Sequence, residues 1–247
     1  MDPKAKVALV TGGARRVGKA ITLALAQAGA NIVINYNASS KEANETCAEA
    51  RTFGVDAIAF QCDVANRDEV LTMVHAAVER FGAIDILVNN ASIFELTPLP
   101  MNDLTQWHRV TNTVIDGPFY LANAIAPLMI QRGAGVIVNI IDLFAWEPRK
   151  NYAAHSIGKA AMDQMTRQLA MDFAPQVRVN AVAPGPVLPS PEFTPERIAQ
   201  TAARTLLNRW GTPQDVADAV LFLIRAEYIT AQTIVVDGGE QHGRYKG

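Results

Sequence analysis

A turn rich in glycine and arginine is the first place in the sequence where residue types and spacing suggest chemistry. The stretch Thr11-Gly12-Gly13-Ala14-Arg15-Arg16-Val17-Gly18 follows a short apolar run and passes directly into a segment with helical spacing. Glycines let the backbone approach a pyrophosphate closely, and the free N–H groups at the start of a helix attract its charge. Tight turns use the same residues, so this stretch alone leaves both interpretations open.

Further polar or small residues stand where other apolar runs end. Asp63 follows the third run, Asn89-Asn90-Ala91 closes the fourth, and Pro184-Gly185 follows the sixth. Ligands of open α/β sheets bind at the carboxyl ends of the strands, so these segments are expected at one edge. The Asp63 carboxylate could accept hydrogen bonds from an adenine amine. Together with the glycine turn, these segments predict a dinucleotide site.

The residues after the second apolar run discriminate between NAD and NADP. An acidic residue there would bind the ribose diol of NAD, but the segment Asn35-Tyr36-Asn37-Ala38-Ser39-Ser40-Lys41 contains none. Arg16 can reach the same space, so a 2′-phosphate would be tolerated and NADP(H) is the predicted cofactor. Ser39 and Ser40 could equally form the N-cap of the next helix, which is compatible with a phosphate-binding role.

Short apolar runs alternate with helical segments along the whole chain. Seven runs rich in Val and Ile predict strands at residues 6–11, 31–35, 57–61, 84–89, 135–141, 177–182 and 233–236. Helical spacing predicts helices at residues 18–28, 41–51, 67–80, 104–132, 153–173 and 213–225, with another from Pro195. Apolar strands without polar alternation are buried on both faces. We therefore predict an α/β fold of Rossmann type, doubly wound, with a seven-stranded parallel sheet flanked by helices.

Composition predicts one domain that covers residues 1–247. Of the 247 residues 49% are hydrophobic, which is enough for one large core, and no linker divides the chain. Residues 183–195 contain five prolines and are expected to form a surface loop.

Charge and cysteine content argue against several classes of protein. Lys plus Arg total 22 and Asp plus Glu total 24, so no net field favours nucleic acid or an anionic membrane. Cys47 and Cys62 are too few to staple the fold, and no Cys/His cluster has zinc spacing, so no metal is expected. No signal pattern opens the chain, and no apolar run reaches the roughly 18 residues of a spanning helix. A cytoplasmic protein that binds a small-molecule substrate is predicted.

The order of these motifs resembles that of the short-chain dehydrogenase/reductase family over nearly the whole chain. The matching segments are the Thr-Gly-x5-Gly turn from Thr11 to Gly18, Asp63, Asn89-Asn90-Ala91, Lys159, Pro184-Gly185 and Val236-Asp237-Gly238-Gly239. Arg16 stands where the family normally has Gly. This substitution and the Asn-Asn-Ala-Ser-x-Phe segment at residues 89–94 are similar to the pteridine reductase branch, and Asn35-Tyr36 and Thr97-Pro98-Leu99 extend the match.

The resemblance implies roles for individual residues. In the pteridine reductase branch an Asp replaces the family's catalytic Ser, and that position is Asp142. Phe94 corresponds to an aromatic residue that sandwiches a pterin against nicotinamide, Tyr152 to a substrate-contacting Tyr, and Ser92 would complete the pocket. Lys159 is expected to contact the nicotinamide ribose. Without the resemblance, Asp142 could simply cap a turn and the two aromatic residues could belong to the core.

Two catalytic positions of the family are substituted. The family's Tyr, four residues before Lys159, is His155, and its Asn, three residues before Gly117, is Val114. His155 is expected to be mostly neutral at pH 7, because the nearby Lys159 ammonium disfavours its protonation. Asp142 is then the predicted proton source or relay, provided that burial raises its pKa or a water chain feeds it.

The predicted cofactor contacts combine the sequence motifs with the resemblance. They are Gly12, Arg15, Arg16, Val17, Asn35, Tyr36, Asn37, Ser39, Asp63, Val64, Asn89, Ala91, Lys159, Pro184, Gly185 and Val187.

Three functions are consistent with this sequence. The first is NADPH-dependent reduction of a pterin-like C=N or a small carbonyl, with Asp142, His155 and Lys159 as catalytic residues. The second is a catalytically degenerate NADP(H)-binding protein, and the third is reduction of a 3-oxoacyl or steroid-like ketone. The resemblance also implies a homodimer or homotetramer, because the helices at residues 104–132 and 153–173 commonly pair across a two-fold axis in this family.

Overall fold

Seven parallel strands form a single sheet in the computed structural model, which describes residues 1–243. The strands are β1 (Val7–Thr11), β2 (Asn31–Tyr36), β3 (Ala57–Gln61), β4 (Ile86–Asn89), β5 (Gly135–Ile140), β6 (Val177–Pro184) and β7 (Thr233–Val236). They lie in the order β3-β2-β1-β4-β5-β6-β7, so the order reverses between β1 and β4. The predicted fold class is confirmed for the described residues, and residues 244–247 of the predicted domain lie outside them.

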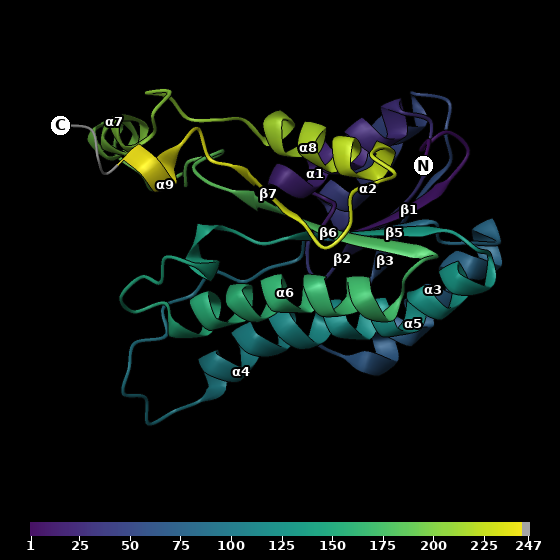
Figure 1. Ribbon diagram of the computed structural model, residues 1–247, viewed down its shortest axis with the longest axis horizontal. Coiled ribbons are helices and arrows are strands. Elements are labelled where there is room, and N and C mark those ends of the chain that lie inside the picture. Colours follow the sequence, from purple (N-terminus) through teal and green to yellow (C-terminus); the bar gives the residue numbers. More distant parts are fainter. Residues whose placement is uncertain (244–247) are drawn as a thin grey trace.

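Helices cover both faces of this sheet (Figure 1). One layer contains α1 (Arg16–Gln27), α2 (Ser40–Arg51) and α8 (Pro213–Arg225). The other contains α3 (Arg67–Phe81), α4 (Thr105–Thr111), α5 (Gly117–Gln131) and α6 (Ala153–Asp172). Two further helices, α7 (Pro195–Arg204) and α9 (Glu240–Gly243), contact each other at one end of the molecule.

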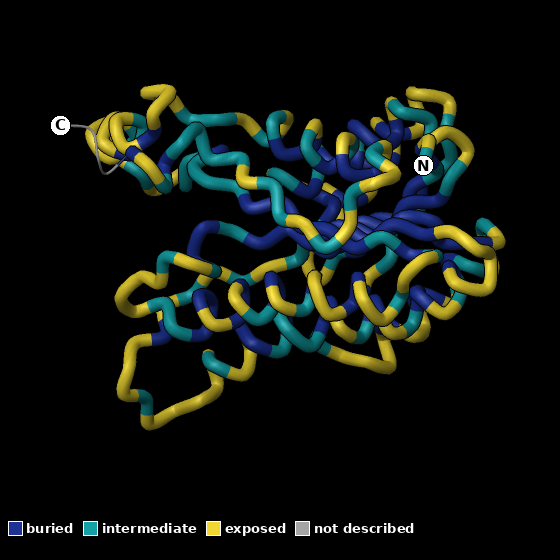
Figure 2. Tube along the Cα trace, viewed as in Figure 1, coloured by how far each residue is buried: buried dark blue, intermediate teal, exposed yellow. Residues whose placement is uncertain are grey.

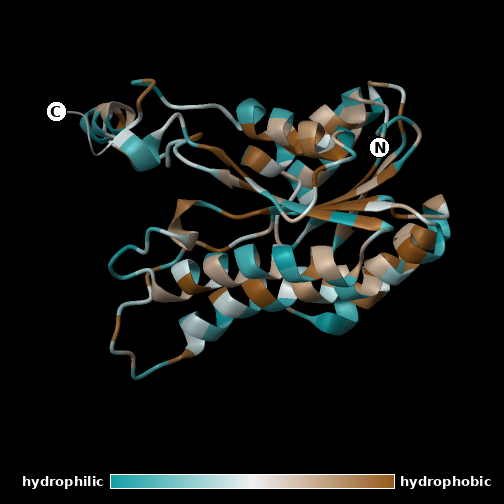
Figure 3. Cartoon of the chain, viewed as in Figure 1, coloured by the Kyte–Doolittle hydropathy of each residue, from teal (hydrophilic) through white to brown (hydrophobic). Residues whose placement is uncertain are grey.

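The alternation of side chains along the strands explains why the central strands are mostly apolar. On β1, Ala8 and Val10 pack toward one helix layer, and Val7 and Leu9 pack toward the other. Successive side chains of a strand point to opposite faces, so a sheet covered twice needs apolar residues at every position. The centre of the sheet is accordingly buried in Figure 2 and mostly hydrophobic in Figure 3, whereas the outer turns of the helices are more exposed and more polar.

The helix predicted at residues 104–132 contains an irregularity that its spacing did not reveal. A π-helical segment, η1 (Asn112–Asp116), joins α4 to α5 without a break. Such segments add one residue to a turn and are frequent at functional sites. Val114 lies on η1 and is fully buried, and a methyl group added at Gly158 of α6 would lie 3.0 Å from it. The π-helical segment therefore presents an apolar side chain to α6.

The same helix bears on the expectation that no apolar run is long enough to span a membrane. Residues Thr105–Gln131 are long and apolar enough to cross a membrane by length and composition, with a mean hydropathy of 1.3. Half of the segment is buried inside the fold, where it packs against α3 and α6. Core helices of globular proteins pass the same test, so this one is explained by its place in the lower layer of Figure 1.

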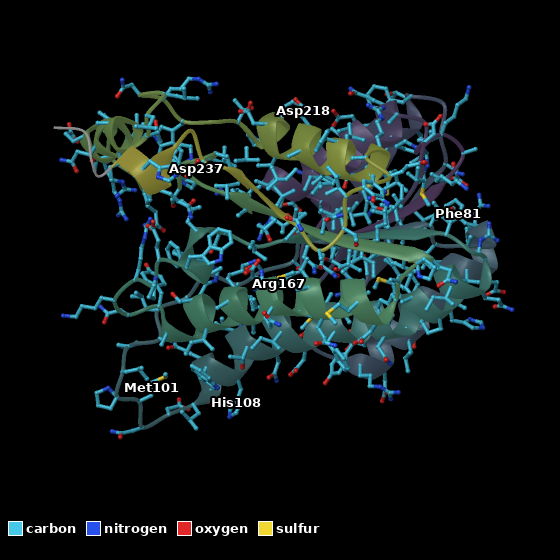
Figure 4. All side chains as sticks on the ribbon, in the orientation of Figure 1. Phe81, Met101, His108, Arg167, Asp218 and Asp237 are labelled. Atoms are coloured by element: carbon cyan, nitrogen blue, oxygen red, sulfur yellow. The ribbon has the colours of Figure 1, made fainter. Side chains whose placement is uncertain are left out.

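Two loops at the carboxyl edge of the sheet surround the candidate site. Residues 185–194 are irregular, as their prolines predict, and lead from β6 into α7. The loop between β4 and α4 projects away from the sheet, with Met101 at its tip (Figure 4). Its base is tied to the start of α6, since the Thr97 amide donates to the Asn151 carbonyl (2.7 Å) and the Ala154 amide donates to the Thr97 hydroxyl (3.0 Å).

Candidate active site

A cleft of about 410 Å³ lies at the carboxyl ends of β1, β2 and β4. This is the point where the strand order reverses, which is the usual ligand position in open α/β sheets. Most of the predicted cofactor contacts line it: Gly12, Arg15, Arg16, Val17, Asn35, Tyr36, Asn37, Ser39, Asp63, Val64 and Ala91. Ser92, predicted to contact substrate, lines the same cleft. We refer to it as the dinucleotide cleft.

The remaining predicted cofactor contacts lie elsewhere. Asn89 is buried in the sheet, where its side-chain amide donates to Asn139 (2.9 Å), and the next residue, Asn90, lines the cleft in its place. Val187 lines a separate pocket near β7. Pro184 and Gly185 line a second cleft described below, and Lys159 is buried beneath it.

The glycine turn fits a pyrophosphate because its backbone is packed too closely for side chains. A Cβ at Gly18 would lie 2.2 Å from the Gly12 carbonyl oxygen and 2.6 Å from the Asn90 side-chain nitrogen. The Asn90 amide holds the turn by donating to the Thr11 carbonyl oxygen (2.8 Å). Gly12 has a φ of +59°, a conformation that favours glycine. The N-terminus of α1 and the Arg15 side chain add positive charge, so these residues suit an anionic dinucleotide.

Arg16 joins the two clefts. Its φ is +55°, in the left-handed region that favours the glycine usual at this position in the family it resembles. Its side chain lines the dinucleotide cleft and also the second cleft, where its guanidinium lies 3.5 Å from the Leu188 carbonyl oxygen. The long basic side chain of Arg16 therefore forms part of the wall of both clefts.

The second cleft has a volume of about 740 Å³ and a mixed aromatic and basic lining. We refer to it as the substrate cleft. Its walls come from the residues after β5, from the loop after β6, from α7 and from Glu240 of α9. The aromatic residues on these walls are Phe94, Phe144, Phe193 and Trp210. Asp142 is the predicted catalytic residue that reaches this cleft, whereas the His155 and Lys159 side chains do not line it.

Asp142 and His155 form a direct pair. One carboxylate oxygen of Asp142 lies 2.7 Å from His155 Nε2, and the other accepts from the Phe144 amide (2.9 Å) at the start of the 3-10 helix η2 (Leu143–Ala145). His155 is only 2% exposed, and its Nδ1 lies 3.0 Å from the Ile93 carbonyl oxygen. Asp142 therefore both caps a turn and binds the histidine.

The partners of the two ring nitrogens determine where protons lie. A carbonyl oxygen only accepts hydrogen bonds, and so does an ionised carboxylate. Burial alone would raise the pKa of Asp142, but the hydrogen bond from His155 and the charge of Lys159 outweigh burial and lower this pKa. The lowered pKa keeps Asp142 ionised, so its carboxylate accepts the hydrogen bond from His155 Nε2. This corrects the expectation that burial raises the pKa of Asp142.

Lys159 interacts electrostatically with Asp142. The residue is 3% exposed, and its ammonium donates to the Ile140 carbonyl oxygen at 2.8 Å. Burial lowers the pKa of Lys159, and the charge of Asp142 opposes this decrease. Val114, at the position where the family has Asn, contributes no polar atom near this lysine.

Two aromatic rings contact the histidine, and the ring of Tyr152 stacks on one of them. The Phe94 ring stacks on the Tyr152 ring, with centroids 4.5 Å apart and an interplanar angle of 20°. The His155 ring makes edge contacts with Phe94 (4.9 Å) and Phe144 (5.4 Å). Phe94 is 57% exposed and lines the substrate cleft, whereas Tyr152 lies behind it. The structure thus brings together Phe94, Tyr152, Asp142 and His155, as predicted, but places Phe94 rather than Tyr152 at the cleft surface.

Comparison with known proteins decides the family. The model of the family described as "Enoyl-(Acyl carrier protein) reductase" matches residues 12–241. A 3-oxoacyl-[acyl-carrier-protein] reductase of Synechocystis sp. is 39% identical over 240 residues, which cover 95% of this chain and 96% of that protein. The chain belongs to the short-chain dehydrogenase/reductase family.

Other relatives of this short-chain dehydrogenase/reductase agree with that assignment. A 3-oxoacyl-[acyl-carrier-protein] reductase of Staphylococcus aureus is 35% identical over 95% of this chain and 97% of that protein. A solved structure of a 7α-hydroxysteroid dehydrogenase in complex with NADH and 7-oxo glycochenodeoxycholic acid superposes with a TM-score of 0.90, at 32% identity and 96% coverage of both chains. The family resemblance predicted from the motifs is therefore confirmed, and the chain is an oxidoreductase of this family.

Sequence reasoning missed most of the substrate cleft of this short-chain dehydrogenase/reductase. Asn90 could have been predicted as a cofactor contact, because it stands within the Asn89-Asn90-Ala91 motif. Arg149, Arg204 and Glu240 gave no signal, because they come from three segments far apart in the chain and meet only in the fold.

The Asp142–His155 pair also predicts how the free energy of unfolding depends on pH. The pKa of Asp142 is lower in the folded state than its unfolded value of about 3.9, so ionisation stabilises the fold. This contribution is complete above the unfolded pKa and is lost as pH falls through the folded pKa. We expect the free energy of unfolding of Asp142→Asn to differ most from the unmodified protein near about pH 7 and least near about pH 3. Urea unfolding at both values checks this, and a difference that stayed constant would contradict it.

Proposed function

We propose that this protein is an NADPH-dependent reductase of a small carbonyl or imine, with the Asp142–His155 pair as its proton source in place of the family's Tyr. The observation that carries the proposal is the short contact between these two side chains. His155 Nε2 lies 2.7 Å from the Asp142 carboxylate while Nδ1 is occupied by the Ile93 carbonyl oxygen. A reductase needs a proton beside the substrate heteroatom, and this pair holds one at the wall of the substrate cleft.

The bound cofactor supplies a hydride to the substrate carbon, and the protein supplies the proton. In this proposal His155 carries a proton on each ring nitrogen, because both nitrogens face acceptors. As negative charge develops on the heteroatom, the proton of His155 Nε2 moves to the Asp142 carboxylate and from there to the heteroatom. His155 is left neutral and keeps its Nδ1 proton on Ile93. Since Asp142 lines the open cleft, water can return a proton to the pair through it.

Lys159 has an electrostatic role in this proposal. Its buried ammonium lowers the pKa of Asp142, so the carboxylate stays ionised until charge develops on the substrate. By the family resemblance, the same ammonium is expected to contact the nicotinamide ribose.

The preference for NADP(H) rests on the charges around the dinucleotide cleft. Arg15 and Arg16 line it, and the segment after β2 that lines it, residues 35–39, has no carboxylate. We expect Asn37→Asp to lower the ratio of kcat/KM for NADPH to that for NADH by roughly tenfold or more, because a carboxylate there would repel a 2′-phosphate. Steady-state kinetics with both cofactors measures this ratio. Asn44→Asp, on the exposed face of α2 and outside the cleft, should leave it unchanged. Equal ratios for both variants would remove this segment from the phosphate site.

Two substrate classes fit the cleft. The aromatic wall of Phe94 and Phe144 favours a planar ring such as a pterin with a C=N bond. The 35% and 39% identical relatives that are 3-oxoacyl-[acyl-carrier-protein] reductases favour a 3-oxoacyl ketone. Parallel assays of NADPH oxidation with dihydrobiopterin and with a 3-oxoacyl thioester separate the two.

A His155→Tyr variant completes that experiment. Turnover by the unmodified protein would support a reductase that works without the family's Tyr. Absence of turnover, with activity gained in the variant, would overturn the proposal in favour of an NADP(H)-binding protein whose proton donor has been lost.

Assembly and location complete the proposal. Phe119 on α5 and Ile157 and Met171 on α6 are exposed, which supports the homodimer or homotetramer predicted for these helices. A cytoplasmic location remains part of the proposal.

A further inference from the structure

The lining of the substrate cleft is positively charged, although the whole chain has a slightly negative net charge. Four arginines line it: Arg16, Arg149, Arg197 and Arg204. They are opposed by Asp142, Glu196 and Glu240, so one positive charge is in excess among the residues that line the cleft. The net charge of the chain is −2. A cleft of this sign in a mildly acidic protein favours an anionic ligand.

Arg149 is connected to the Asp142–His155 pair through one aromatic ring. Its guanidinium carbon lies 4.5 Å from the centroid of the Phe144 ring. The edge contact between Phe144 and His155 connects this ring to the pair at 5.4 Å. One aromatic ring therefore separates the Arg149 charge from His155.

The hydrogen-bonding groups of Arg149 are not used within the fold. Glu240 lies 3.7 Å away, which is an ion-pair distance but too long for a hydrogen bond. The same Glu240 oxygen is engaged by Arg204 at 2.8 Å. Across residues 1–243 the Arg149 side chain donates no hydrogen bond, so the contacts with Phe144 and Glu240 position a guanidinium whose N–H groups remain available.

The other three arginines of the cleft make different contacts. Arg204 is bound to Glu240, and Arg197 lies over the Phe193 ring, 3.9 Å from its centroid, on the wall formed by α7. Arg16 is shared with the dinucleotide cleft. These residues contribute to the field of the cleft, but Arg149 combines a free fork of donors with a place next to the catalytic pair.

We propose that Arg149 binds a carboxylate of the substrate, so that the reacting C=O or C=N lies against Asp142 with a planar spacer along Phe144. The substrate class is then a planar oxo or imino acid. A guanidinium binds a carboxylate through two parallel hydrogen bonds, which fixes orientation as well as distance. This inference rests on the proposed reductase function for its reactive group, but the binding of the carboxylate can be measured without turnover.

Kinetics with a matched pair of aldehydes tests the inference. The probes are 4-formylbenzoate and its methyl ester, which share the carbonyl group and differ in the charge at the opposite end. We expect the unmodified protein to prefer the acid in kcat/KM by roughly ten- to hundredfold, mainly through KM, as a charge-assisted hydrogen bond implies. Arg149→Gln should abolish the preference, and Arg149→Lys should retain part of it because the charge is kept.

Binding without turnover separates this inference from the proposed function. Titration of the protein and NADP⁺ with 4-(hydroxymethyl)benzoate or its methyl ester can be followed by tryptophan fluorescence, since Trp210 lines the cleft. The acid should bind more tightly than the ester in the unmodified protein, but not in Arg149→Gln. Arg109→Gln, which removes an exposed arginine paired with Glu95 outside the cleft, is the matched control and should keep the difference.

Each outcome of these measurements decides one of the two proposals. Preferential binding of the acid that depends on Arg149, without reduction of either aldehyde or of the other substrates, supports the anion site and argues against the reductase. Equal binding of acid and ester by the unmodified protein, or a preference that survives in Arg149→Gln, overturns the anion site.

Discussion

Asp142→Asn should keep its affinity for NADPH and lose its reductase activity, with kcat lower by about 10²- to 10⁴-fold. An amide can still accept from the Phe144 amide and face His155, so the turn at η2 can form. It cannot take the proton of His155 Nε2 and pass it to the substrate. The His155 side chain cannot replace it, because it is 3% exposed and does not line the cleft.

Two measurements make this test specific to proton transfer. NADPH binding, followed by its fluorescence, shows that the variant is folded and holds the cofactor. Asp218→Asn, an exposed carboxylate on α8 far from the site (Figure 4), should match the unmodified protein in both assays. If Asp142→Asn retained activity within about threefold, the proton would have to come from another group and the proposed role of the pair would be wrong.

Gly18→Ala should lose most of its nucleotide affinity. The added methyl group would lie 2.2 Å from the Gly12 carbonyl oxygen, a backbone atom that cannot rotate away. Relief requires α1 to move from the turn, which would shift the amide groups expected to hold the pyrophosphate. Overpacking of this kind costs about 1–3 kcal/mol, so we expect a Kd for NADPH at least roughly tenfold higher and a lower midpoint of urea unfolding.

Gly133→Ala is the control for this variant. Gly133 has a φ of +79° with open space around the position of a Cβ, so alanine there adds backbone strain of about 1 kcal/mol without a clash. It should lower stability slightly and leave NADPH binding unchanged. A Gly18→Ala protein that bound NADPH like the unmodified one would contradict the close-packed description of the turn.

The sheet could be predicted because burial on both faces leaves a strong local signal. β1 and β5 are buried at every position, and their runs of Val and Ile are visible without knowledge of the fold. The π-helical segment at Asn112–Asp116 could not be predicted, since one extra residue in a turn hardly changes apolar spacing. Its consequence, a buried Val114 packed toward α6, depends on the partner helix.

The glycine turn and the surroundings of His155 also differ in how far their geometry could be predicted from the sequence. The glycine turn is contiguous, so its residue types predicted its geometry. The contact of His155 Nδ1 depends on the Ile93 carbonyl, a backbone oxygen that every residue type has and that only the fold brings to this nitrogen. The sequence showed the nearby Lys159 but not this acceptor, so the hydrogen-bond partners of His155 could not be predicted.

Arg16 belongs to the walls of both clefts, and we expect this shared residue to couple the binding of ligands in them. A flexible guanidinium loses rotamer freedom when a ligand on either side orders it. The first ligand to bind bears that entropic cost, and the second meets an arginine already in place. Cofactor and substrate would then strengthen each other's binding, and by thermodynamic reciprocity the coupling has the same size in either direction. We therefore expect an arginine in place of the family's glycine at this position to make ligand binding in the two clefts cooperative.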